Sequence, residues 1–329
     1  MKKMLMAAGM AAVMTACVTA GQKAATDAGN PFLAEYSTPF GVPPFDLIKV
    51  EHYKEAFLKG MEEQKKEIDA IVNQRSVPDF DNTIAAFDQS GELLNKVSTV
   101  FSGLNSCNTN DEMQAFNKEI TPLLSAHRDD ISLNPALFAR VKEVYERREK
   151  LGLDKEQNKL LEETYKKFVR GGANLDSVDQ AKLRQLNSEI SMLQLTFGQN
   201  LLKETNAFEL VIDKKEDLAG LPESLVASAA EAAKGAGMEE KWLFTLHNPS
   251  VMPFLQYADN RELREKIFKG YINRGNNGNE ADNNEIVKKL VALRLEKAKL
   301  MGYADYASYI LEDRMAKNEE NVYRLLNQI

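Results

Sequence analysis

Apolar residues recur at helical spacing along almost the whole chain from Ile48 onward, and this periodicity is the feature that most constrains the fold. In the first such stretch the apolar positions lie three, four or seven residues apart, which places them on one face of a helix. These positions are Tyr53, Phe57, Met61, Ile68 and Ile71. A chain of 329 residues can also bury a sizeable core. The sequence therefore predicts a mostly α protein, built as a large multi-helix assembly.

Two later apolar stripes predict long helices over 182–204 and 285–301. Ser177 and Gln180 have the spacing of a capping box, which predicts the start of the first of these helices. The pair Gly171 and Gly172 closes the preceding helix, and Gly302 ends the last one, because glycine tolerates the left-handed conformation past a helix end. The stripes consist of Leu183, Leu186, Ile190, Leu193, Phe197 and Leu201, and of Ile286, Leu290, Leu293 and Leu300.

Three segments depart from the helical pattern. The runs 207–212 and 241–246 are rich in β-branched and aromatic residues and predict a small β insertion. The segment 30–46 contains four prolines, so it should lie extended over the surface. We expect the phenylalanines of that segment to pin it down. They are Phe32, Phe40 and Phe45.

The N-terminus has the three parts of a bacterial export signal. Lys2 and Lys3 precede an apolar run, 4–14, that is shorter than the ~20 residues a membrane-spanning helix needs. Thr15-Ala16-Cys17 completes a lipobox-like sequence, with Met14 where Leu is more usual. We therefore predict a signal peptide at 1–16, a lipid attached to Cys17, and a lipid anchor with a flexible tether at 17–30. Cleavage without lipid is the alternative. The prediction is an exported, membrane-anchored lipoprotein facing the periplasm or the cell surface of a bacterium.

Composition and charge exclude several function classes. The net charge is −7 and the pI is about 5.3, with no basic stripe, so no nucleic-acid partner is expected. Cys107 is the one cysteine besides Cys17, which leaves no disulfide framework, and we expect a half-buried thiol there.

No catalytic motif is visible in these residues. None of the three histidines begins H-E-x-x-H, the pattern that sets two zinc ligands one helical turn apart, so each is expected to be structural. The turn-rich segment 274–279 is either a plain interhelical loop or a loop that lines a cleft and contacts substrate. The histidines are His52, His127 and His247.

Several strings nevertheless resemble, in order and spacing, the bacterial peptidyl-dipeptidases of the thimet-oligopeptidase-like zinc metallopeptidase family. The resemblance runs from about Asn30 to Ile329. The strings are TPFGVPPFD at 38–46, EHY at 51–53, FVRGGANL at 168–175, LAGLP at 218–222, LHNPS at 246–250, YINRG at 271–275 followed by DN at 282–283, and LRLEKAKLMGY at 293–303.

The resemblance implies a helical, two-lobed peptidase whose lobes flank a narrow channel with zinc at its floor. It implies an enzyme that hydrolyses short peptides and releases C-terminal dipeptides. In such enzymes the zinc lowers the pKa of a bound water and polarises the scissile carbonyl. Members of the family are longer than this chain and carry H-E-x-x-H in their later half, so no catalytic or metal residue is assigned here. Zinc is expected in the complete enzyme, with none bound by this chain.

On this interpretation 31–240 is an N-terminal helical region and 241–329 is the start of the catalytic region. The segment 321–329 has the pattern of an uncapped amphipathic helix, which suggests truncation. We therefore expect an inactive N-terminal part of a peptidase, whose partners are short peptides, its own missing C-terminal half, and a membrane reached through the lipid. The helices 182–204 and 285–301 would frame the channel. The alternative is a stand-alone lipoprotein that binds peptides without catalysis.

Overall fold

The computed structural model describes residues 29–329, which form two compact units. Unit 1 contains the described residues up to Glu67 together with Gln89–Thr109, and unit 2 contains Ile68–Asp88 together with Asn110–Ile329. Both units are mostly helical, which confirms the predicted fold class. The predicted signal peptide, Cys17 and nearly all of the tether lie outside the described residues. None of the helices in the described part of the chain combines the length and apolar character needed to cross a bilayer.

Unit 1 is held together by aromatic rings. Tyr53 and Phe57 on α1 meet Phe101 on α3, with ring centroids 5.0 Å and 5.7 Å from that of Phe101. Phe32 lies 5.2 Å from Tyr53 and is buried. A Cβ on Gly60 of α1 would lie 2.9 Å from backbone atoms of α3, so glycine there permits the close approach of the two helices. The elements are the 3₁₀ turns Pro31–Leu33 and Pro39–Gly41, and the helices α1 (Val50–Val72, through Glu67) and α3 (Glu92–Cys107).

Two predictions in this unit are wrong. Phe32 does anchor the proline-rich strip, but Phe40 is fully exposed and Phe45 is half-exposed. Hydrogen bonds also hold the strip in place, because the Lys96 ammonium donates to the carbonyls of Phe32 and Ala34 at 3.1 and 2.8 Å. Cys107 is exposed rather than half-buried, since α3 ends at this residue.

The first part of unit 2 is a helical layer with its own apolar core. The core joins the end of α1 to the π-helical turn and to α5 and α6, with Ile68, Ile84, Leu137, Leu161 and Phe168 among its buried members. The elements are the π-helix Phe80–Ala85, α2 (Ala86–Asp88), α4 (Asp111–Ser132), α5 (Pro135–Glu146), α6 (Lys155–Arg170) and α7 (Ser177–Ala207).

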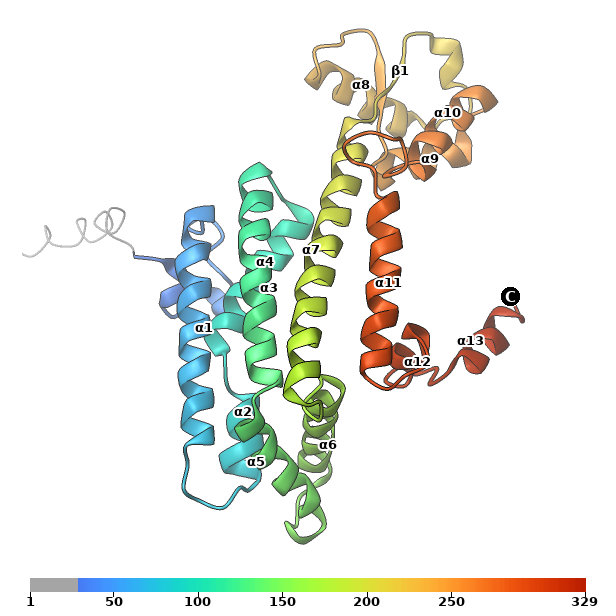
Figure 1. Cartoon of the computed structure of the whole chain (residues 1–329). Coiled ribbons are helices and arrows are strands. Elements are labelled where there is room, and N and C mark those ends of the chain that lie inside the picture. The colour runs from blue at the N-terminus through green and yellow to red at the C-terminus, as the bar shows by residue number, and fades with distance from the viewer. Residues whose placement is uncertain (1–28) are drawn as a thin grey trace, which may run out of the picture. The chain divides into compact units, whose positions relative to one another are not determined.

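The long helix α7 lies between α4 and α11 (Asn284–Leu300), side by side with both (Figure 1). A polar bridge crosses the three helices. The Lys297 ammonium donates to Asn187 Oδ1 at 2.6 Å, and Asn187 Nδ2 donates to Asp129 Oδ1 at 2.8 Å. Burial raises the pKa of Asp129 and lowers the pKa of Lys297, so the amide between them compensates two partly desolvated charges.

The start of α7 differs from the prediction. Asp176 is the N-cap, and its carboxylate accepts from the backbone N–H groups of Val178 and Asp179, both at 2.9 Å. Ser177 is therefore the first helical residue, and Gln180 donates to the carbonyl of Leu175 instead of completing a capping box. An ionised aspartate at this position also interacts favourably with the positive end of the helix dipole.

The predicted β insertion is confirmed in a shorter form. Strand β1 (Leu210–Ile212) pairs antiparallel with β2 (Trp242–Phe244), with Val211 opposite Leu243. The hairpin packs into a core of its own with α8, α9 and α10, in which Phe244 and Phe254 are fully buried. Figure 1 shows this subdomain at the C-terminal end of α7. The helices are α8 (Glu223–Gly235), α9 (Asn248–Tyr257) and α10 (Arg261–Ile272).

After α11 the chain turns at Gly302, whose φ of 85° confirms the predicted glycine stop. At the end of α6, by contrast, Gly171 has an ordinary φ of −80° and Gly172 takes the left-handed conformation. The last helix is also not uncapped as predicted, since it begins at Glu319 and the Asn318 side chain accepts from the N–H of Asn321 at 3.0 Å. The final elements are α12 (Tyr306–Leu311) and α13 (Glu319–Leu326).

Candidate functional site

The carboxylate of Glu204, near the C-terminal end of α7, is buried, and the loop 274–283 wraps around it. One oxygen, Oε2, accepts from the backbone N–H of Gly275 and from Asn277 Nδ2 at 2.9 Å. The other, Oε1, accepts from Asn279 Nδ2 at 2.7 Å. The side chain is only 8% exposed, and no lysine or arginine of the described residues pairs with it. The loop therefore supplies neutral donors in place of a counter-ion.

These donors decide the charge of Glu204. Burial favours the protonated form, but the hydrogen bonds from Asn277, Gly275 and Asn279 together outweigh burial and hold the pKa of Glu204 below its usual range. The group is therefore ionised at neutral pH. A buried charge of this kind fixes the loop, because any movement of the loop would leave the carboxylate without partners.

Asn283 ties the other end of the loop to α7. Its backbone N–H donates to the carbonyl of Gly275 at 2.7 Å, which closes the loop on itself. Its side chain donates to the carbonyl of Phe197 at 3.2 Å and accepts from Asn200 Nδ2 at 3.0 Å. Asn283 is almost completely buried, so these bonds are made away from water. The loop is thus attached to α7 at Glu204 and, through Asn283, at Phe197 and Asn200 earlier in the same helix.

Gly275 occupies a position that only glycine fits well. Its φ is +73°, and a Cβ there would lie 2.8 Å from Asn283 Nδ2. Gly278, in the same loop, has a φ of +63° but open space around it. The carboxylate of Asp282 accepts from the N–H of Gly278 at 2.9 Å and from the N–H of Asn284 at 2.8 Å, which fixes the turn into α11.

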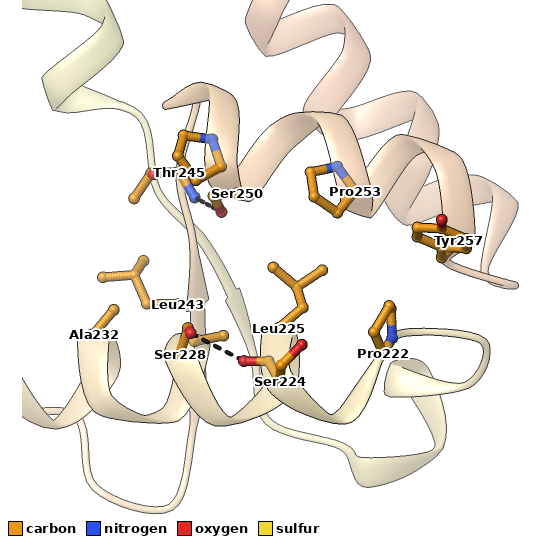
Figure 2. Close-up of a pocket in the computed structure, with 12 residues that line it drawn as sticks. Pro222, Ser224, Leu225, Ser228, Ala232, Leu243, Thr245, Ser250, Pro253 and Tyr257 are labelled. Atoms are coloured by element: carbon orange, nitrogen blue, oxygen red, sulfur yellow. Dashed lines mark hydrogen bonds between the residues drawn. The ribbon is translucent and has the colours of Figure 1, made fainter.

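A cavity of about 460 Å³ lies elsewhere in the subdomain, between α8 and α9 (Figure 2). Ser224, Ser228 and Ala232 follow one face of α8, and the opposite wall carries Pro253 and Tyr257 of α9. Leu225 and Leu243 lie between the two helices in this view. Its lining contains no acidic or basic side chain, so this groove offers shape and apolar surface without catalytic groups.

A second cavity, of about 380 Å³, lies beside Glu204 and offers different chemistry. One wall is apolar, with Phe208 and Leu246. Gly270 of α10 permits this wall, since a Cβ there would lie 2.3 Å from the Phe208 ring. The polar side carries a carboxylate, two cations and three amides. The lining residues are Glu204, Ala207, Phe208, Leu246, Lys269, Gly270, Asn273, Arg274, Asn277 and Asn279. Because it combines an apolar wall with fixed polar groups, this second cavity is the candidate functional site.

The three histidines lie in different parts of the fold. His52 Nδ1 accepts from the N–H of Lys49 at 3.0 Å at the start of α1. His247 bridges Thr245 Oγ1 at 3.0 Å and Asn206 Oδ1 at 3.1 Å, and His127 lies within α4. Within residues 29–329 no group of three or more His, Cys, Asp or Glu side chains is arranged to hold a metal ion.

The loop 274–279, left open in the sequence as a plain connection or a cleft-lining loop, does line a cavity. Glu204 was not singled out from the sequence. A signal for it was present, because position 204 continues the three- and four-residue spacing of the apolar stripe through Phe197 and Leu201. A carboxylate at a buried position of a helix indicates a polar partner elsewhere in the chain.

Comparisons with known proteins show which peptidases this chain resembles. Residues 254–329 match Peptidase family M3. Over 300 residues, 91% of the chain, it is 40% identical to the dipeptidyl carboxypeptidase of Escherichia coli (strain K12), of which it covers 44%. It is 40% identical to the dipeptidyl carboxypeptidase of Salmonella typhimurium, over 88% of the chain and 43% of that relative. It is 29% identical to oligopeptidase A of Haemophilus influenzae, again over 88% of the chain and 43% of the relative.

The chain is therefore similar to members of peptidase family M3. Within that family its similarity is greater to the two dipeptidyl carboxypeptidases than to the oligopeptidase A sequence. The chain spans less than half the length of each of these relatives. The family resemblance seen in the sequence is thereby confirmed.

Substitution of Glu204 by Gln should destabilise the protein in a pH-dependent way. We expect a loss of about 1–3 kcal/mol at neutral pH, because one amide hydrogen of the glutamine must face a donor. The folded-state pKa of Glu204 is lowered, so its contribution is fully present above the unfolded pKa of about 4.3 and is lost as the pH falls through the folded pKa. Urea unfolding from pH 7 down to pH 3 should show the difference between wild type and variant shrinking.

Glu280→Gln is the matched control, because Glu280 is in the same loop but is exposed and paired only with Lys203. Its effect should stay within about 0.5 kcal/mol. An equal effect of both substitutions, or a difference for Glu204 that grows in acid, would contradict the assigned role.

Alanine at the two loop glycines should separate backbone strain from crowding. Gly278→Ala should cost about 1–2 kcal/mol for the left-handed conformation alone. Gly275→Ala should cost at least about 1 kcal/mol more, because its Cβ also displaces the Asn283 amide. Thermal unfolding of both variants measures the difference, and equal costs would show that the Asn283 contact is unimportant.

Proposed function

We propose that this chain forms part of a zinc-dependent peptidyl-dipeptidase that hydrolyses short peptides and releases C-terminal dipeptides. The observation that carries the proposal is the 40% identity to dipeptidyl carboxypeptidase over 91% of the chain. The match to Peptidase family M3 over 254–329 supports the same class of reaction. Because the chain covers 44% of that relative, it supplies only part of the enzyme in this proposal.

The part supplied is a wall of the peptide-binding channel. In this proposal α7 and α11 are its framework, and the loop 274–279 contacts the peptide. The support is that α7 and α11 pack along each other and are joined by ion pairs, such as Lys182 with Glu296 at 2.8 Å. The loop is fixed by Glu204 and lines a cavity. A rigid loop beside a cavity can orient a peptide at little cost in the conformational entropy of the loop itself.

The residues of this chain do not fit a zinc site. The sequence has no H-E-x-x-H, and residues 29–329 contain no cluster of suitable ligands. We propose that the zinc ligands lie in the part of the relatives' sequences that this chain does not match. The chain alone should then hold no stoichiometric zinc and should release no dipeptides.

The same unmatched part of the enzyme could cover the exposed apolar face of α11. Val287, Val291 and Leu295 lie four residues apart on one face of the helix and are 45%, 61% and 38% exposed. Four-residue spacing forms a continuous apolar stripe. An exposed stripe of this kind is typical of a surface that another helix covers. We propose that the C-terminal half of the enzyme covers it.

A chimera tests the proposed function. Residues 30–329 would replace the matched region of the Escherichia coli dipeptidyl carboxypeptidase, with the rest of that protein unchanged. We expect release of dipeptides from a short blocked peptide, loss of activity with a chelator, and its return with zinc. The control is the Escherichia coli remainder alone, which should be inactive. A folded chimera that binds zinc but cleaves nothing would contradict the proposal and favour a peptide-binding module without catalysis.

We also propose export and lipid anchoring at Cys17, on the strength of residues 1–17. In a bacterial host the chain should incorporate a labelled fatty acid and partition into membranes. Cys17→Ala should abolish both, because the thiol is the attachment point. Cys107→Ala is the matched control and should retain the label. Labelling of the Cys17 variant, or none of the wild type, would refute the anchor.

A further inference from the structure

The cavity beside Glu204 contains an arginine that is held in place but lacks an acidic partner. Arg274 Nε donates to the carbonyl of Tyr271 at 2.9 Å, and Nη1 donates to Thr205 Oγ1 at 2.9 Å. Its guanidinium also stacks on the Tyr271 ring, 3.9 Å from the centroid. We propose that Arg274 binds the C-terminal carboxylate of a peptide in this cavity.

The Arg274 guanidinium has N–H donors that make no hydrogen bond within the described residues. It carries five N–H groups, and the two bonds to Tyr271 and Thr205 leave Nη2 without a partner among the described residues. No carboxylate of the described residues pairs with Arg274. Three other arginines of this unit form ion pairs: Arg147 with Glu143, Arg170 with Glu312 and Arg184 with Asp130.

The nearby carboxylate does not serve as that partner. Both oxygens of Glu204 are occupied by donors of the loop. The second cation of the cavity, Lys269, is paired with Glu265 at 2.6 Å. Arg274 is therefore the cation of this cavity that remains available to an incoming anion. Its planar fork matches a carboxylate, which can accept two parallel hydrogen bonds.

The rest of the lining suits the end of a peptide better than a small inorganic anion. Phe208 and Leu246 form an apolar wall for a side chain. The half-buried side-chain amide of Asn273 makes no hydrogen bond within the described residues and can therefore bond a peptide group. The cavity volume of about 380 Å³ accommodates one or two residues.

This inference rests on the proposed function for the identity of the ligand, but its test does not depend on catalysis. The purified chain is titrated with N-acetyl-leucyl-leucine and with the C-terminal amide of the same dipeptide. The readouts are calorimetry and the NMR signals of the arginine Nε–H groups. We expect the acid to bind at least about tenfold more tightly than the amide, because a charge-assisted pair is lost in the amide. The Arg274 signal should shift with the acid only.

Variants assign the effect to Arg274. Arg274→Gln should weaken binding of the acid at least about tenfold and leave binding of the amide unchanged. Arg274→Lys should recover part of the loss, since it keeps the charge without the planar fork. Arg261→Gln, an exposed arginine on α10 with the same change of charge, should alter affinity less than about twofold. Circular dichroism confirms that each variant is folded.

Equal affinity for acid and amide in the unmodified chain would overturn the proposal, and that comparison needs no variant. Tighter binding of N-acetyl-glutamate amide than of the dipeptide acid would overturn the assignment to a C-terminal carboxylate. An inactive chimera together with selective binding of the acid would refute the proposed function and leave this site intact.

Discussion

The arrangement of the candidate site depends on one ionised carboxylate buried in a helix. A charge removed from water is tolerated only where it is compensated, and Glu204 is compensated by three N–H donors of a single loop. The loop cannot move away without leaving that charge unsatisfied. The left-handed glycine at 275 and the buried amide of Asn283 follow from the same requirement, because they bring the backbone close enough to donate.

The helix that carries Glu204 is also the central element of its unit. Along its length α7 packs on α4 and α11, and a bridge of Asp129, Asn187 and Lys297 joins all three helices. Near its C-terminal end the same helix contributes Glu204 and Thr205 to the loop and to Arg274. The position of Arg274, proposed above to bind a carboxylate, is therefore set by a rigid helix rather than by a free loop. Sites built on rigid elements favour selective binding.

Much of the fold could be predicted from the sequence, because apolar periodicity reports directly which helix faces are buried. The apolar faces of α1, α7 and α11 were predicted in this way. The β insertion was predicted instead from its β-branched and aromatic residues. One error arose where two neighbouring side chains could fill the same role. Ser177 and Asp176 both suit an N-cap, and only the structure shows that Asp176 takes the position. The site was harder still, since Glu204 and the residues that bind it lie about 70 residues apart, as for Gly275 and Asn277.

Amide hydrogen exchange at Gly275 tests most directly whether Glu204 holds the loop. In the wild-type protein the N–H of Gly275 donates to a buried carboxylate and should exchange slowly at neutral pH. In Glu204→Gln it should exchange at least about tenfold faster, while the amides of β1 and β2 keep their wild-type rates. Unchanged protection of Gly275 in a folded variant would show that the loop keeps its shape without the carboxylate and would contradict the account.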